Sequence, residues 1–126
     1  MLLLRSFDAR PSPGRWAAVS GYVTRELLDQ SYLEIEKQCG YTRGNLKLAI
    51  RGEPLDVQRA AGRLRVYPLL FDVLTDAEPR LDGESPACRW VEPHELSRLK
   101  TVSRLWEAWQ RLLAAEDKPY RLAKEP

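Results

Sequence analysis

Residues 33–41 read Leu-Glu-Ile-Glu-Lys-Gln-Cys-Gly-Tyr, and this stretch decides the fold prediction. It closes a helical pattern, because apolar side chains recur at helical spacing at Leu28, Tyr32, Ile35 and Cys39. One stripe of the helix is therefore expected to face a core, with Cys39 as a small buried apolar residue. Gly40 is expected to end the helix in the left-handed conformation that glycine adopts without strain.

The polar residues of the same helix carry mixed charge. Glu34, Lys37 and Gln38 lie three and four residues apart, so their side chains are expected to share one face. One interpretation is a solvated face with a weak intrahelical ion pair, which stabilises a helix by about 0.3 kcal/mol. The other is a ligand site, in which Lys37 is a candidate to bind phosphate.

Strand-like and helix-like patterns alternate along the rest of the chain, without an internal repeat. Strands are expected over 2–5, 16–23, 46–50, 64–74 and 87–92, and a second amphipathic helix over 102–115. We expect the third and fourth strands to form an antiparallel hairpin with a long loop. Together these patterns predict an α+β domain, with a mixed sheet and a helix against each face. Trp106 and Trp109 are expected to anchor the second helix in a core or an interface.

Length and charge exclude several classes of protein. The chain has 126 residues, which suits a single domain, expected over 1–116, and a polar tail over 117–126. Twenty Lys and Arg against 18 Asp and Glu give a formal charge of +2, so neither a membrane nor a specific nucleic acid is an expected partner. The apolar start at 1–4 is too short for a secretory or membrane segment.

The cysteines and the histidine indicate no metal centre. Cys39 and Cys88 lie far apart, without a Cys or His at ligand spacing, so neither a zinc site nor a disulfide framework is predicted. A reduced, cytoplasmic setting is therefore expected. His94 follows Pro93 in a turn and is expected at the surface.

Three segments, taken together, resemble the Nudix (MutT-like) hydrolase family. Residues 33–41 resemble the Nudix box, R-E-U-x-E-E-x-G-U, where U is an apolar residue. Residues 14–23, which include Gly21, resemble the strand and glycine-bearing loop before the box, and 89–96 resemble the closing strand and turn. The resemblance implies a Nudix-like α/β/α sandwich whose first strand is short or missing. A bare sheet edge at that strand is expected, and with it either a homodimer through the edge or a cap over it.

The box is degenerate. Leu33 replaces the arginine, Lys37 and Gln38 replace the last two glutamates, and Glu34 remains. Nudix hydrolases bind Mg²⁺ or Mn²⁺ through box glutamates, because these cations prefer carboxylate oxygens. An ammonium group repels a cation by about 4 kcal/mol per unit charge at about 4 Å in a medium of effective dielectric near 20. At most a weak metal site at Glu34 is therefore expected. The loop before the box is two residues short of the family spacing, and Glu26 is the nearest candidate for the missing upstream glutamate.

Two functions remain open. The first is a Nudix-fold binding or interaction module, weak or inactive as an enzyme, that holds a nucleotide or another phosphorylated small molecule. Its candidate ligand-binding residues are Arg15, Trp16, Gly21, Lys37 and Gln38. Arg63 and Arg65 are further candidates for phosphate contacts.

The second function is a divergent Nudix pyrophosphohydrolase that cuts a nucleoside diphosphate linked to another group. Glu34, Glu36 and Glu84 would gather around Mg²⁺ or Mn²⁺. Glu84, with Asp82 beside it, is the candidate for the carboxylate that a later loop supplies in some Nudix enzymes. The candidate catalytic residues are therefore Glu34 and Glu84, and the candidate metal ligand is Glu34.

Overall fold

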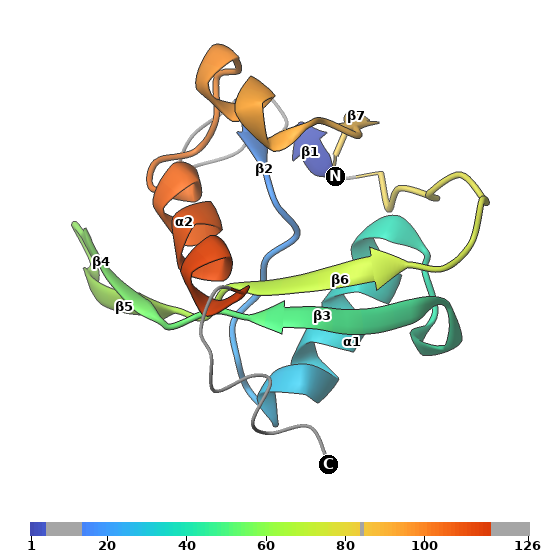
Figure 1. Ribbon diagram of the computed structural model, residues 1–126, viewed down its shortest axis with the longest axis horizontal. Coiled ribbons are helices and arrows are strands. Elements are labelled where there is room, and N and C mark those ends of the chain that lie inside the picture. Colours follow the sequence, from blue (N-terminus) through green and yellow to red (C-terminus); the bar gives the residue numbers. More distant parts are fainter. Residues whose placement is uncertain (5–13, 84, 117–126) are drawn as a thin grey trace. The chain divides into compact units, whose positions relative to one another are not determined.

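The computed structural model describes residues 1–4, 14–83 and 85–116. Its strands are β1 (Leu2–Leu4), β2 (Trp16–Ala17), β3 (Leu46–Arg51), β4 (Leu55–Arg59), β5 (Gly62–Val66), β6 (Leu69–Val73) and β7 (Ala87–Arg89). The helices are α1 (Leu27–Cys39) and α2 (Leu105–Glu116), with short 3-10 helices at Arg43–Asn45 and Pro93–Arg98 (Figure 1). This content of helices and antiparallel sheets confirms the predicted α+β class. None of the helices in the described ranges is long and apolar enough to cross a membrane.

The chain divides into two compact units. The first comprises Met1–Lys47 and Val73–Ser103, and the second comprises Leu48–Asp72 and Arg104–Pro126, of which the structure describes the residues up to Glu116. Each unit therefore joins segments that lie far apart in the sequence. The candidate site on α1 belongs to the first unit.

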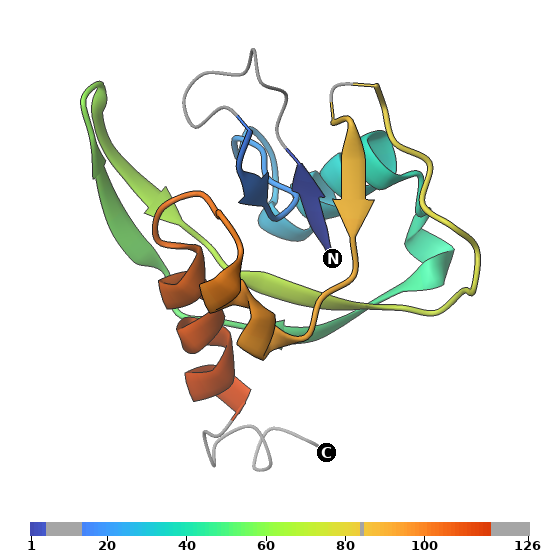
Figure 2. The same cartoon turned by 90° about the horizontal axis from the view of Figure 1, so that it is seen from above.

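The first unit contains a three-stranded sheet in the order β2-β1-β7 (Figure 2). Strand β1 pairs antiparallel with both neighbours, and Leu3 lies opposite Ala17 on one side and Cys88 on the other. The prediction of a bare edge at the first strand is therefore wrong, because β1 is the central strand. The expected strand over 16–23 is regular only at Trp16–Ala17, and the strand expected over 87–92 ends at Arg89.

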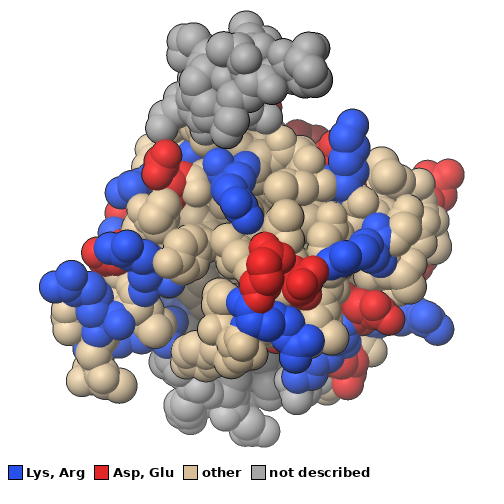
Figure 3. Space-filling model, turned by 90° about the horizontal axis from the view of Figure 1, so that it is seen from below, with Lys and Arg blue, Asp and Glu red and all other residues tan. Residues whose placement is uncertain are grey.

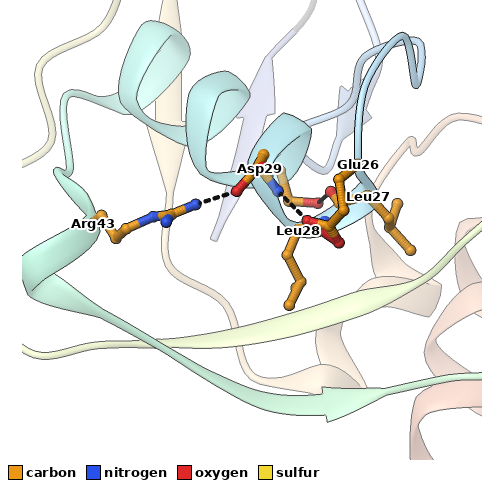
Figure 4. A network of polar contacts seen from close by, with 6 residues as sticks. Glu26, Leu27, Leu28, Asp29 and Arg43 are labelled. Carbon is orange, nitrogen blue, oxygen red and sulfur yellow. Dashed lines mark hydrogen bonds and ion pairs between the residues drawn. The ribbon is translucent and has the colours of Figure 1, made fainter.

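Helix α1 begins and ends where local sequence signals place it. Glu26 is the N-cap, and its carboxylate accepts hydrogen bonds from the backbone N–H groups of Leu28 at 2.9 Å and Asp29 at 3.1 Å (Figure 4). Gly40 follows the helix with φ of 80°, as predicted, and its N–H donates to the Glu36 carbonyl. An added Cβ on Gly40 would lie 3.1 Å from Arg80 Cβ, so glycine also permits close packing here.

Strands β3 and β6 pair with each other, and the boundary between the two units falls within both strands. Their backbone runs antiparallel, since Leu74 N–H donates to Asn45 O at one end and Gly52 N–H donates to Pro68 O at the other. The expected pairing of these regions is thus confirmed. The expected strand over 64–74 is two strands, β5 and β6, separated at 67–68, and the expected long loop contains β4.

The second unit has a small apolar core. Ile50 on β3 packs with Leu112 and Ala115 on α2, each at most 6% exposed. Trp109 packs against this cluster, as expected of a core anchor, whereas Trp106 is 47% exposed. Helix α2 is amphipathic as predicted but begins at Leu105, three residues after the predicted start.

Candidate functional site

A row of three polar side chains runs along α1. Gln30, Glu34 and Gln38 are spaced by four residues, so they lie on one face of the helix. Gln30 Nε2 donates to Glu34 Oε2 at 2.8 Å, and Gln38 Nε2 donates to Glu34 Oε1 at 2.9 Å. Both oxygens of the Glu34 carboxylate therefore accept a hydrogen bond from a neutral amide.

The loop before α1 joins the same network. Gln38 Nε2 also donates to the Ser20 carbonyl at 2.9 Å. Thr24 donates twice to Gln30 Oε1, from its backbone N–H at 3.3 Å and from its hydroxyl at 3.0 Å. The helix face and the loop over 20–24 are thus fastened at two points, on either side of Glu34.

Gly21 lies directly against the Glu34 carboxyl group. A Cβ added at Gly21 would lie 2.4 Å from Glu34 Cδ and 2.5 Å from Glu34 Oε2, far inside van der Waals contact. A larger residue at this position would therefore force the Glu34 side chain to shift, and with it the hydrogen bonds of its carboxylate. The group that Gly21 approaches is thus the box glutamate itself.

The chemistry of the partners fixes the orientation of both amides. Gln38 Nε2 lies between two acceptors, the Ser20 carbonyl and the Glu34 carboxylate, so an N–H group must stand there. Gln30 Oε1 faces two donors of Thr24, which leaves its amide nitrogen to donate to Glu34. Gln38, which replaces a box glutamate, thus acts as a donor, whereas a metal ligand must present an oxygen lone pair.

The described residues do not fit the divalent cation that the resemblance implies. Among residues 1–4, 14–83 and 85–116, no group of three or more His, Cys, Asp or Glu side chains is arranged to hold a metal ion. Glu26, the candidate for the missing upstream glutamate, accepts hydrogen bonds with both carboxylate oxygens from the first turn of α1. Glu36 is exposed. Asp82 is also exposed, and Glu84 lies outside the described residues.

The remaining predicted ligand residues lie in the same unit. Lys37 is exposed, and the hydrogen bonds of Glu34 go to glutamines and not to this lysine. Arg15 is exposed and donates to the Thr101 carbonyl at 3.2 Å. Trp16 is half-buried, and its backbone bonds to Lys100 and Val102.

Two features of α1 were not found from the sequence. Gln30 is only 6% exposed and is the buried polar residue that completes the network. Its position four residues before Glu34 was the available signal. Arg43, beyond the end of the helix, donates to Asp29 at 2.8 Å (Figure 4). Its guanidinium group also stacks over the Tyr32 ring, 4.1 Å from the ring centroid.

The end of α1 holds two protonated groups. Cys39 is 1% exposed, as predicted for a small apolar residue, and burial raises the pKa of its thiol to about 11. Burial also raises the pKa of Tyr41, whose hydroxyl donates to the Ala77 carbonyl at 3.1 Å. Neither side chain supplies an anion at neutral pH. His94 is exposed, as predicted.

Comparison with known proteins identifies the fold. No model of a protein family matches the sequence, and no curated protein matches it significantly. An Ap4A hydrolase from C. elegans, solved as a binary complex, has a TM-score of 0.72 and 17% identity, over 90% of this chain and 82% of that one. RenU, a Nudix hydrolase from M. smegmatis, has a TM-score of 0.70 and 19% identity, over 99% of this chain and 76% of that one. The chain thus has a Nudix-like fold, as predicted.

Proposed function

We propose that this Nudix-fold chain is a binding or interaction module with a degenerate metal site, weak or inactive as a hydrolase. The observation that carries the proposal is the state of Glu34. Both of its carboxylate oxygens accept hydrogen bonds from Gln30 and Gln38, and the Gln38 amide is also tied to Ser20. A cation at Glu34 would have to share each oxygen with an amide donor or displace that donor.

Energetics support the same conclusion. A hydrogen bond to a charged group contributes about 1.5–3 kcal/mol, so a cation that displaced both donors from Glu34 would first lose several kcal/mol. Gln30 is buried, and its amide would be left without its acceptor, which adds a desolvation penalty. A single carboxylate cannot offset these costs, since Mg²⁺ sites of this kind use several oxygen ligands.

The proposed ligand is a nucleotide or another phosphorylated small molecule. The fold neighbour from C. elegans is an Ap4A hydrolase, which makes a nucleotide the first class to test. In the proposed site, exposed Lys37 supplies positive charge to phosphate without a metal, and Arg15 adds a second cation. Trp16 is the proposed stacking surface for a base. A cytoplasmic setting accompanies this proposal.

The second candidate is the divergent hydrolase, with Glu34, Glu36 and Glu84 around Mg²⁺ or Mn²⁺. The observation in its favour is that both fold neighbours are named as hydrolases. The two candidates differ in whether ligand binding requires a divalent cation and in whether a phosphate anhydride is cut. Both differences are measurable on the same protein preparation.

The experiment measures binding and turnover together. Ap4A, nucleoside di- and triphosphates and nucleotide sugars are titrated calorimetrically in EDTA, and phosphate or pyrophosphate release is followed with Mg²⁺ and with Mn²⁺. We expect metal-independent binding and little turnover. A variant with Lys37→Glu and Gln38→Glu is expected to gain Mn²⁺ affinity, read by electron paramagnetic resonance.

A matched pair of variants separates the two candidates. Glu34→Gln removes the network carboxylate, whereas Glu92→Gln makes the same change at an exposed position. Metal-dependent turnover of the wild type that Glu34→Gln abolishes and Glu92→Gln preserves would overturn the proposal and establish the hydrolase.

A further inference from the structure

The β4–β5 hairpin presents two chemically different faces. Its register places Asp56 opposite Arg65 and Gln58 opposite Arg63, so these four polar side chains share one face. The other face carries the apolar residues of both strands, among them Leu55, which is 3% exposed. Sequence reasoning treated the two arginines as candidates for phosphate contacts and did not find strand β4. Their register makes them part of a sheet surface.

The polar face carries an excess of positive charge. Arg65 Nε donates to Asp56 Oδ1 at 3.1 Å, and Arg63 lies 3.8 Å from Asp56 Oδ2. The hydrogen bond from Arg65 lowers the pKa of Asp56, so this carboxylate is ionised at neutral pH. Two guanidinium groups offer about ten N–H donors, and one carboxylate cannot satisfy them. Both arginine side chains are more than half exposed.

The two edges of the hairpin differ. Two arginine side chains contact β4 and the residue before it. Arg104, which precedes α2, donates to Asp56 O at 3.5 Å, and Arg111 on α2 donates to Pro54 O at 2.9 Å. In the described part of the chain, β4 and β5 form a two-stranded sheet of their own, so no strand pairs with the outer edge of β5. Such an edge exposes backbone N–H and C=O groups that can pair with another extended chain.

We propose that the β5 edge binds an extended acidic segment of another protein by strand addition, with carboxylates of that segment on Arg63 and Arg65. The spacing fits this partner, since alternate side chains of an added strand face the same way and meet arginines two residues apart. Backbone pairing supplies affinity, and the arginine-carboxylate contacts supply selectivity and orientation.

Charge argues against the other occupants of this edge. A second copy of the same edge would bring like charges together, which disfavours self-pairing. A nucleic acid cannot pair with a backbone ladder and binds through many phosphate contacts. Figure 3 shows both Lys and Arg and Asp and Glu side chains on the face drawn.

The test uses fluorescence anisotropy on the full chain. The probe is a labelled peptide of about eight residues in which Glu and Val alternate, a length that spans the edge of one strand. Two controls share the labelling: the same sequence with alternate backbone nitrogens methylated, and a peptide in which Lys replaces every Glu. We expect binding of the acidic peptide, about tenfold weaker binding of the methylated one, and no binding of the basic one.

Variants locate the site. Arg63→Glu with Arg65→Glu is expected to weaken binding at least tenfold, and Arg63→Gln with Arg65→Gln to weaken it less. Arg59→Glu is the matched control, because Arg59 is exposed in the same hairpin but belongs to the opposite face. Circular dichroism checks the fold of each variant.

Several results would overturn the proposal. The first is that the acidic peptide does not bind at concentrations up to about 1 mM, where even weak contacts are detected. The second is that the methylated peptide binds as tightly as the unmethylated one. Equal loss in Arg59→Glu would also overturn it, as would binding of an oligothymidylate in preference to the peptide.

Discussion

Replacing Gln38 by glutamate is the sharpest perturbation of the α1 network. Gln38 Nε2 donates to Ser20 O and to Glu34 Oε1, both at 2.9 Å. A glutamate has nearly the same shape but carries no donor at neutral pH. The substitution therefore removes both hydrogen bonds and sets a second carboxylate beside the first.

The magnitude follows from these distances. The lost hydrogen bond to the charged Glu34 is worth about 1.5–3 kcal/mol, and two unit charges about 4 Å apart repel by about 4 kcal/mol at an effective dielectric of 20. Both side chains are half-buried, so solvent screening and rotation of the new side chain relieve much of the repulsion between the two carboxylates. We expect the free energy of unfolding to fall by about 2 kcal/mol at pH 7 and the Tm by about 6–10 °C.

The loss should depend on pH. Two adjacent carboxylates share a proton, so the variant's pair titrates with an apparent pKa above that of the unfolded chain. A pKa raised in the folded state means that stability is lost as pH rises, because the folded protein binds the extra proton. The difference between variant and wild type is therefore expected to be small near pH 4 and full at pH 7.

Urea unfolding and thermal melts measure this effect in EDTA and in Mg²⁺. We expect Mg²⁺ to restore part of the Tm of Gln38→Glu and to leave the wild type unchanged, because the cation binds the new carboxylate pair. Gln110→Glu is the matched control, the same change at an exposed position of α2. If Gln38→Glu is as stable as the wild type in EDTA at pH 7, or if Gln110→Glu loses as much, the amide does not hold Glu34 as described.

Three further predictions concern the same unit. Gly21→Ala places a Cβ 2.4 Å from Glu34 Cδ and should lower the free energy of unfolding in urea by about 1–3 kcal/mol. Gly44→Ala is the control, because nothing lies within 4 Å of the added Cβ, and it should change the free energy of unfolding by less than about 0.5 kcal/mol. Equal losses in the two variants would contradict the contact between Gly21 and Glu34. Glu26→Ala removes the N-cap and should cost about 1 kcal/mol while hydrogen exchange accelerates in the first turn of α1; unchanged exchange there would refute the cap. Because the pKa of buried Cys39 is raised from 9.0 to about 11, the unfolded chain loses this proton first, and stability should fall between pH 9 and 11 by up to about 3 kcal/mol. Cys39→Ala should shrink that alkaline loss, and an identical slope in the variant would show that another group causes it.

The first strand and the hairpin show where prediction from the sequence failed. A short apolar start suggested an edge strand, but β1 lies between β2 and β7, whose residues come from distant parts of the chain. The run over 64–74 looked like one strand, although Pro68 lacks the N–H that an uninterrupted ladder needs. Pairing partners across long separations are not encoded in local patterns.

The sequence by itself determined helix α1, its glycine end and the loss of two box carboxylates, because helix periodicity, capping and side-chain charge are local properties. It also indicated that Glu34 and Gln38 share one face of this helix. Only the tertiary structure decided that Gln30 joins them and that both glutamine amides donate to Glu34, since the direction of a hydrogen bond depends on the loop folded over the helix. The residue types thus determine which polar groups are present, and the loop over 20–24 determines which hydrogen bonds they form.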